Sequence, residues 1–258
     1  MLAVDAGNSS VKAARWDGHA WCDAARWPSD PDADWAARLA PLAAGVTRSG
    51  LASVVPRLTG PLVHALASCL GAPPIVVSTD LALPFAMAYR TPQTLGADRL
   101  AAAVAAWDGW GGDRAVVALD AGTAVTLDVV VPHGPGRGPA YLGGAIAPGP
   151  DLLRRALARD TGQLPDVPWV TPPSPIGAST TEALQAGLMG LFAEGVAGLL
   201  RQTADALDAP PVVVATGGWG AWLAERIGGI DAVAPDLVLD GIRHLSGEPG
   251  PDIRTAPR

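Results

Sequence analysis

Two short stretches decide the fold of this chain: DAGNSSVK at residues 5–12 and LDAGTAVTLD at residues 119–128. In each, an apolar run ends at Asp-Ala-Gly, a hydroxyl residue follows, and a second apolar run resumes. This pattern predicts two antiparallel strands joined by a tight glycine turn. Each turn also opens a series of predicted strands that is followed by predicted helices. A motif and an element order that recur together indicate an internal duplication.

The duplication predicts an α/β protein of two lobes, residues 1–112 and 113–258, with a cleft between the two turns. In the first lobe, hydrophobic periodicity predicts strands at 1–5, 11–16, 20–27, 51–55 and 75–77, and helices at 35–42, 58–70 and 98–107. In the second it predicts strands at 116–120, 125–131, 141–146 and 212–215, and helices at 151–158, 180–207, 219–227 and 235–245. A proline-rich connection lies at 163–175.

Composition excludes several classes of protein. The chain has 258 residues, 49% of them hydrophobic, which is enough to fill a core. With 18 basic and 25 acidic residues the net charge is −7, which argues against a non-specific nucleic-acid binder. Lys12 is the single lysine, so no polybasic segment exists for anionic lipid.

Location follows from similar observations. Cys22 and Cys69 lack metal-ligand spacing and are too few for a disulfide scaffold, which favours a reducing compartment. The N-terminus has no basic region before Asp5, unlike a signal peptide. The apolar stretch 183–200 contains Glu194 and four glycines, and therefore predicts a buried helix rather than a membrane span. We expect a cytoplasmic protein that binds neither nucleic acid nor membrane.

The paired turns indicate phosphate binding. Gly7 and Gly122 leave backbone N–H groups open to phosphate oxygens, and the hydroxyls of Ser9 and Thr123 add donors. Asp5 and Asp120 would repel phosphate, so they imply Mg²⁺ or another hard cation. A single turn of this kind is more often an ordinary strand end. Two such turns favour a polyphosphate.

Two further features add to this interpretation. Lys12 lies on the strand that returns from the first turn, where a compact cation can face phosphate, although a surface lysine is the alternative. GADR, residues 96–99, begins a predicted helix. Asp98 there is either a capping residue or a base that accepts a proton from a substrate hydroxyl, with Arg99 holding an anionic group. No P-loop or Rossmann glycine motif is present in the sequence.

Six blocks in register resemble type III pantothenate kinase: DAGNSSVK (5–12), YRTPQTLGADRL (89–100), LDAGTAVTLD (119–128), LGGAIAPG (142–149), STTEALQAG (179–187) and ATGGW (215–219). The resemblance implies the duplicated, ribonuclease H-like fold of the actin-like ATPases, with mixed sheets flanked by helices. It implies ATP-dependent phosphorylation of pantothenate to 4′-phosphopantothenate, the first step of coenzyme A biosynthesis. It further implies Mg²⁺, a monovalent cation (K⁺ or NH₄⁺) and a homodimer, with the helix from Thr180 to Leu200 as an interface candidate.

Site residues carry over position by position. The resemblance implies an ATP-binding turn made of Asp5, Ala6, Gly7, Asn8, Ser9, Ser10, Val11 and Lys12, with Thr123 as a second nucleotide contact. It implies Asp98 as the catalytic base and Asp120 as the ligand of the monovalent cation. It implies pantothenate contacts from Tyr89, Gly96, Ala97, Arg99 and Thr180. The first turn has Ser9 where many members have threonine, which keeps the hydroxyl.

Two other functions stay open at this level. A sugar or acyl kinase on the same fold is disfavoured because GADR lacks the neighbouring Asp, Asn and Glu residues that a polyhydroxyl ring requires. A nucleotide-responsive regulator without catalysis is disfavoured because Asp5, Asp98 and Asp120 are all present. The four histidines are scattered without ligand spacing, and most tryptophans suit packing, although Trp219 follows a glycine pair and is placed to flank a nucleotide.

Overall fold

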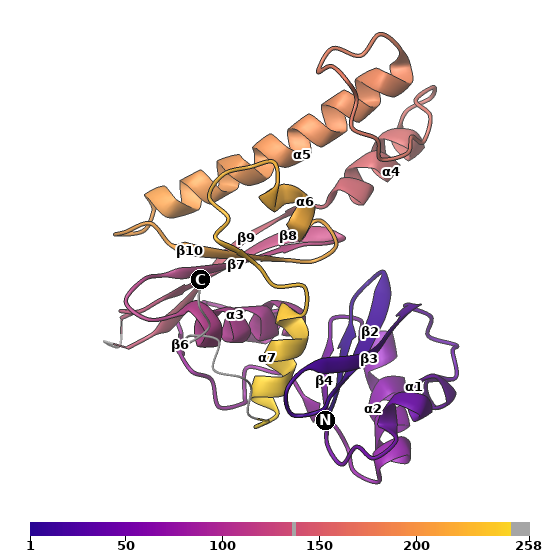
Figure 1. Cartoon of the computed structure of the whole chain (residues 1–258), viewed down its shortest axis with the longest axis vertical. Helices are drawn as coiled ribbons and strands as arrows, with labels where there is room; N and C mark the ends of the chain where they lie inside the picture. Colours follow the sequence, from indigo (N-terminus) through magenta and orange to yellow (C-terminus); the bar gives the residue numbers. More distant parts are fainter. Residues whose placement is uncertain (136–137, 249–258) are drawn as a thin grey trace. The chain divides into compact units, whose positions relative to one another are not determined.

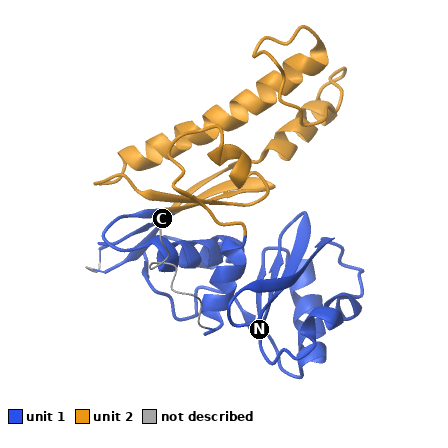
Figure 2. Ribbon diagram, viewed as in Figure 1, with its two compact units in different colours: residues 1–116, 129–142, 236–258 blue, residues 117–128, 143–235 orange. Residues whose placement is uncertain are grey.

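A computed structural model of the chain describes residues 1–135 and 138–248. It is an α/β structure with two β-sheets and flanking helices (Figure 1). The chain forms two compact units that are discontinuous in sequence (Figure 2). Unit 1 comprises 1–116, 129–142 and 236–258, and unit 2 comprises 117–128 and 143–235. The chain thus leaves unit 1 and returns to it twice.

Unit 1 contains a five-stranded mixed sheet in the order β3-β2-β1-β4-β5. β1 pairs antiparallel with β2, and β2 with β3, whereas β4 and β5 run parallel to β1. The strands are β1 (Leu2–Ala6), β2 (Ser10–Trp16), β3 (Trp21–Pro28), β4 (Ser49–Ser53) and β5 (Ile75–Val76). Its helices are α1 (Trp35–Ala43), α2 (Pro56–Leu70), η1 (Pro92–Thr94), α3 (Ala97–Trp110) and α7 (Leu237–Leu245).

Helices cover both faces of this sheet (Figure 1). Side chains alternate between faces along a strand. Leu51 of β4 therefore joins the fully buried cluster made with α1 and α2, which includes Leu39, Leu58 and Leu62. Gly50 faces the other way, and an added Cβ there would collide with Ile242 and Ser246. Glycine at this position lets α7 pack directly on the sheet.

α7 also packs against α3, the helix that begins with GADR. An added Cβ at Gly241 would collide with the Ala101 backbone, so the two helix backbones approach closely there. α3 is almost entirely buried from Arg99 to Trp107, because its alanines leave no exposed polar face. The C-terminal helix thereby contacts both the first sheet and the helix carrying the candidate base.

The second sheet has six strands in the order β11-β10-β7-β8-β9-β6. Its strands are β6 (Ala86–Met87), β7 (Val116–Ala121), β8 (Ala124–Val131), β9 (Ala140–Pro148), β10 (Val212–Thr216) and β11 (Ala232–Val233). Unit boundaries fall within β7, β8 and β9. The helices of unit 2 are α4 (Pro150–Asp160), α5 (Thr180–Asp205) and α6 (Gly220–Ala224).

α5 is long and apolar enough to cross a membrane by length and composition, although such helices also occur as core helices of soluble proteins. Only 39% of its most apolar window is buried, and Leu191 is 61% exposed. The helix therefore keeps an apolar face that this single chain does not cover. The sequence prediction of a helix here is confirmed, but full burial within one chain is not found.

Candidate active site

The first predicted turn joins β1 to β2 in unit 1. The Gly7 N–H donates to the Ser10 carbonyl at 3.0 Å, and Asn8 and Ser9 are exposed. Asp5 lies opposite Lys12 in the antiparallel register, so their side chains share one face of the sheet. Residues 5–12 thus form an exposed turn with one carboxylate and one ammonium at its base.

The second turn joins β7 to β8 in unit 2 and follows the same plan. The Gly122 N–H donates to the Ala124 carbonyl at 2.9 Å. Neither Gly7 nor Gly122 has a positive φ, and an added Cβ at either would meet no atom closer than 3.5 Å. The fold of each unit does not require glycine at these positions. The missing side chain instead leaves room for a ligand against each turn.

Glycine is required elsewhere around Asp120. Gly217 has φ +81°, and an added Cβ would collide with Asp120 Oδ1 and lie 2.6 Å from the Ala121 carbonyl oxygen. The Trp219 N–H donates to that same carbonyl at 2.9 Å. Gly217 therefore leaves a small space bordered by a carboxylate oxygen and a backbone carbonyl. These are the oxygen donors that hard cations prefer.

Metal binding at these turns is limited by the number of carboxylates. Within residues 1–135 and 138–248, no three or more His, Cys, Asp or Glu side chains form a group that could hold a metal ion by themselves. Asp5 and Asp120 are single carboxylates in separate units. Such residues fit an Mg²⁺ that brings most of its oxygens from phosphate and water, and a monovalent cation that uses backbone carbonyls.

Asp98 lies in the first turn of α3, where the helix dipole favours a carboxylate. Its Oδ1 accepts a hydrogen bond from the Arg99 N–H at 2.7 Å. Burial raises the pKa of the Asp98 carboxyl, although this hydrogen bond and the Arg99 charge oppose the shift. An added Cβ at Gly96 would lie 2.6 Å from Asp98 Oδ1 and 3.3 Å from Val54. The absence of a side chain at Gly96 therefore leaves the space that the Asp98 carboxylate occupies.

Arg99 is a buried cation that bonds to one ring of an aromatic cluster made of Phe85, Tyr89 and Tyr141. Its side chain is 8% exposed, and its Nη2 donates to the Tyr141 hydroxyl at 3.3 Å. Tyr141 is fully buried on β9, stacks on Phe85 at 6.1 Å and meets Tyr89 edge to face at 5.9 Å. Unit 1 thus brings together four of the predicted acceptor residues, Tyr89, Gly96, Ala97 and Arg99, with the predicted base.

Tyr141 was not among the residues predicted from sequence. It stands directly before the LGGAIAPG block, and a tyrosine in an apolar strand gives no signal of its own. Its position next to that block is the sequence feature that could have indicated it.

The remaining predicted residues lie in unit 2 or have an additional partner. Thr123 follows Gly122 in the second turn, and its carbonyl accepts from the Gly149 N–H at 3.0 Å. Thr180 is exposed at the start of α5, which Ser179 caps by accepting from the Glu182 N–H. Lys12, in unit 1, forms an ion pair with Asp236 at 2.7 Å.

Trp219 belongs to an aromatic cluster in unit 2. Its ring lies 5.1 Å from Trp169, 5.8 Å from Phe192 and 5.7 Å from Trp222 between centroids, each edge to face. Trp169 Nε1 donates to Asp151 Oδ1 at 2.8 Å, and Gln185 Nε2 donates to the Pro168 carbonyl at 3.0 Å. The cluster fixes the proline-rich connection against α4 and α5. Packing accounts for these rings, as expected for most of the tryptophans.

Solved structures define the fold of the chain. The chain is similar to a ROK hexokinase from Thermus thermophilus, with TM-score 0.51, 18% identity and coverage of 96% of this chain and 98% of that one. It is also similar to a ROK-family glucokinase from Streptomyces griseus, with TM-score 0.53, 14% identity and 96% and 99% coverage. At these identities the likeness shows the fold alone. The chain has the actin-like fold of the sugar kinases, as the family resemblance implied.

Sequence comparison gives the family within that fold. The sequence model of type III pantothenate kinase matches residues 1–202. A type III pantothenate kinase from Anaeromyxobacter sp. strain K is 38% identical over 195 residues, covering 76% of this chain and 74% of the relative. One from Gluconobacter oxydans is 34% identical over 270 residues, covering 100% and 97%. The chain belongs to the type III pantothenate kinase family.

Proposed function

We propose that this chain transfers the γ-phosphoryl group of ATP to the primary hydroxyl of pantothenate, giving ADP and 4′-phosphopantothenate, the first step of coenzyme A biosynthesis. Family membership supports the activity. The observation that carries the site assignment is the half-buried Asp98 carboxylate beside buried Arg99 at the start of α3.

Asp98 is the base in this proposal. It orients the pantothenate hydroxyl and accepts its proton while the hydroxyl oxygen bonds to the γ-phosphorus and the bond from that phosphorus to the ADP oxygen breaks. A carboxylate whose pKa is raised by burial is a stronger base than an exposed aspartate. Phosphoryl transfer depends mainly on such positioning and on charge stabilisation.

Arg99 binds the carboxylate of pantothenate. Successive helix residues point about 100° apart, so the Asp98 and Arg99 side chains diverge and can address two ends of one substrate. Tyr89, the partly accessible ring beside buried Phe85 and Tyr141, suits the apolar dimethyl centre of pantothenate. This ring offers few partners for a polyhydroxyl ring, which argues against a sugar acceptor.

The two turns hold the donor. Residues 5–12 and Thr123 contact the phosphates, with Lys12 as the cation. Asp5 would hold Mg²⁺, and Asp120 would hold K⁺ or NH₄⁺. These cations, when bound, neutralise the phosphate charge that develops during transfer.

The activity is tested by ADP release from the purified chain with Mg²⁺-ATP, with and without pantothenate, in K⁺ and in Na⁺ buffer. We expect release that depends on pantothenate and is several-fold faster in K⁺. The Asp120→Asn variant should lose the K⁺ stimulation and keep nucleotide binding. ADP release by folded protein that does not depend on pantothenate would indicate another acceptor. Equal rates in K⁺ and Na⁺ would contradict the assignment of a K⁺ site to Asp120.

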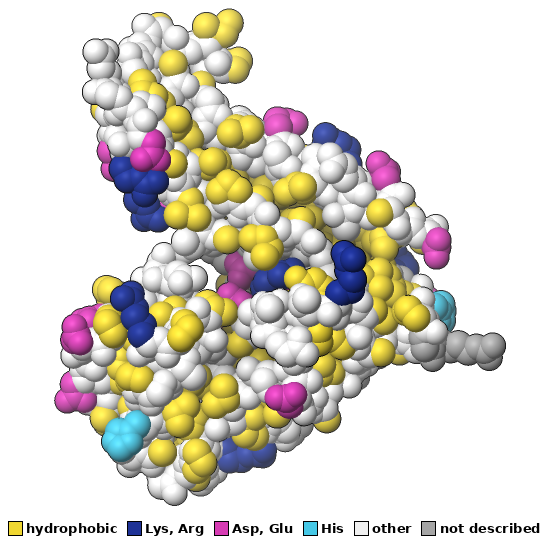
Figure 3. Space-filling model, turned by 180° about the vertical axis from the view of Figure 1, so that it is seen from behind, with side chains coloured by type: hydrophobic (Ala, Val, Ile, Leu, Met, Phe, Trp, Pro, Cys, Tyr) yellow, Lys and Arg dark blue, Asp and Glu magenta, His cyan; other side chains and the backbone are white. Residues whose placement is uncertain are grey.

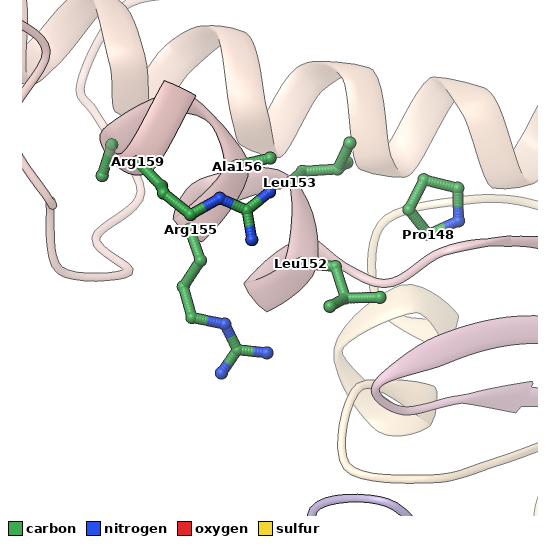
Figure 4. A pocket seen from close by; sticks show the side chains of 7 residues that line it. Pro148, Leu152, Leu153, Arg155, Ala156 and Arg159 are labelled. Atoms are coloured by element: carbon green, nitrogen blue, oxygen red, sulfur yellow. The ribbon is translucent and has the colours of Figure 1, made fainter. Parts of the chain in front are cut away.

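The enzyme is, in our proposal, a cytoplasmic homodimer that binds neither nucleic acid nor membrane. Unit 2 supports the dimer, because large apolar side chains on β9, α4 and α5 are exposed: Ile146, Leu152, Leu157 and Leu191. Beside α4 lies an open groove of about 610 Å³ lined by Pro148, Leu152, Leu153, Arg155, Ala156, Ala158 and Arg159. Figure 4 shows Arg155 and Arg159 extending from α4, with Leu152 and Pro148 farther along.

Charge on this face suits a second copy of the chain. Figure 3 shows Lys and Arg side chains beside acidic ones on the α4 side of unit 2. Arg154 pairs with Asp166, and Arg159 with Asp160. A face with both signs of charge around an apolar centre is suited to self-association.

The dimer prediction is tested by light scattering. Wild type should have twice the mass of one chain, and Leu191→Glu should shift it toward the monomer because a charge cannot be buried unpaired at an interface. Val76→Glu, at an apolar position of similar chemistry in β5 of unit 1, should leave the mass unchanged. A dimer that persists in Leu191→Glu would place the interface elsewhere.

A further inference from the structure

The Lys12–Asp236 ion pair joins two residues 224 positions apart in sequence. Lys12 Nζ lies 2.7 Å from Asp236 Oδ1. Asp236 occupies the N-cap position of α7, yet its side chain makes no capping hydrogen bond to the helix. The carboxylate is directed to the lysine instead of to the backbone N–H groups that an N-cap aspartate normally serves.

Both ends of this pair are accessible to solvent. The Lys12 side chain is 22% exposed and that of Asp236 is 41% exposed. A partly exposed ion pair contributes little to stability, so an incoming anion can replace one partner at little cost. Lys12 is also the cross-strand partner of Asp5, so a second carboxylate lies on the same face of the sheet. A triphosphate approaching this lysine therefore meets an excess of negative charge.

We propose that Asp236 is an internal competitor of the donor phosphates for Lys12, and thereby sets the affinity of the enzyme for nucleotide. This inference rests on the proposed role of Lys12 in donor binding. With no nucleotide bound, Asp236 neutralises the ammonium and keeps it ordered. When Mg²⁺-ATP binds, phosphate oxygens take the place of the Asp236 carboxylate at Lys12 Nζ.

The exchange affects only the start of α7. Further along, Trp21 Nε1 donates to Asp240 Oδ1 at 3.0 Å, and Gly241 packs on Ala101. These contacts hold the helix on the first sheet and on α3. Asp236 is also the first residue of the segment in which the chain returns to unit 1. Donor binding therefore frees the Asp236 side chain at the start of α7, while the rest of the helix stays in place.

The test measures Mg²⁺-ATP binding by calorimetry without pantothenate, so that no turnover occurs. Asp236→Asn removes the competing charge but keeps an oxygen that Lys12 can bond. We expect its Kd for Mg²⁺-ATP to fall about three- to tenfold below that of wild type. Asp240→Asn is the matched control, because it removes the same charge one turn further along α7, from a carboxylate that accepts a hydrogen bond from Trp21. Its Kd should stay within twofold of wild type.

A double-mutant cycle separates direct competition from long-range charge. In a Lys12→Met background, adding Asp236→Asn should no longer tighten binding. In wild type, hydrogen exchange at residues 236–240 should speed up when Mg²⁺-ATP binds. Equal tightening by Asp240→Asn, or tightening that persists without Lys12, would overturn the proposal. So would weaker binding by Asp236→Asn, which would make Asp236 a support for Lys12 rather than its competitor.

Failure of this inference is distinguishable from failure of the proposed function. The calorimetric Kd values report only donor binding. Pantothenate-dependent ADP release by wild type reports the reaction. If the wild type phosphorylates pantothenate but Asp236→Asn does not change the Kd, the proposed function stands and the competitor role of Asp236 is excluded.

Discussion

Replacing Asp98 by asparagine is expected to lower kcat about 10²- to 10⁴-fold while raising the thermal stability of the protein. The amide cannot accept the hydroxyl proton, so turnover falls. Stability rises because burial penalises the ionised carboxylate, as its raised pKa indicates. The asparagine Oδ1 can still accept the hydrogen bond from the Arg99 N–H, so local structure is kept.

The pH dependence of the wild type follows from the same shift. A carboxyl with a raised pKa holds its proton more tightly in the folded protein than in the unfolded chain. Its contribution to the unfolding free energy is therefore full below the unfolded pKa and is lost as pH rises through the folded pKa. Activity instead increases as pH rises through this pKa, because the base must be ionised. On the acidic side of the pH profile, kcat/KM should therefore rise at a higher pH than it would with an ordinary aspartate as the base.

Three measurements check this prediction: kcat, Tm from thermal unfolding, and both as functions of pH. Asp108→Asn is the control on the same helix, since Asp108 is exposed and pairs with His244 at 3.3 Å. It should leave kcat unchanged. An Asp98→Asn protein that is folded and turns over at the wild-type rate would exclude Asp98 as the base.

Replacing Arg99 by glutamine is expected to raise the KM for pantothenate about 10- to 100-fold, with a smaller effect on kcat. Arg99 is a buried guanidinium, and a hydrogen-bonded charge pair with the substrate carboxylate is lost. The wild type should strongly prefer pantothenate over its neutral amide analogue. The variant should lose this preference, because a neutral side chain no longer distinguishes carboxylate from amide.

Two further variants keep this prediction testable if Arg99→Gln folds poorly. Tyr141→Phe removes only the hydroxyl that accepts from Arg99 Nη2, and should raise KM in the same direction by a smaller factor with kcat preserved. Arg57→Gln, at an exposed arginine on α2, should change neither constant. Undiminished discrimination between pantothenate and its amide in Arg99→Gln would assign the carboxylate to another cation.

The local elements of this protein were determined by its sequence alone. Strand periodicity on either side of Asp5-Ala6-Gly7 predicted β1, β2 and the turn between them, and the same pattern predicted β7 and β8. Apolar spacing at Leu62, Leu66 and Leu70 predicted α2; Leu62 and Leu66 are fully buried, and Leu70, at the end of the helix, is partly buried. These elements follow from interactions within a few residues, which sequence patterns record. β6 and β11 have two residues each, too few to show a period.

Tertiary structure decided which of these residues meet. The Lys12–Asp236 pair spans 224 residues and the Arg99–Tyr141 bond spans 42, and no local pattern encodes either. Gly217 gained its meaning only when its backbone was placed against Asp120. The composition of unit 1, with its C-terminal segment beginning at Asp236, likewise depends on where the chain returns. The sequence determined the parts and the chemistry each carries, and long-range packing determined their partners, because periodicity is local and contacts between distant segments are not.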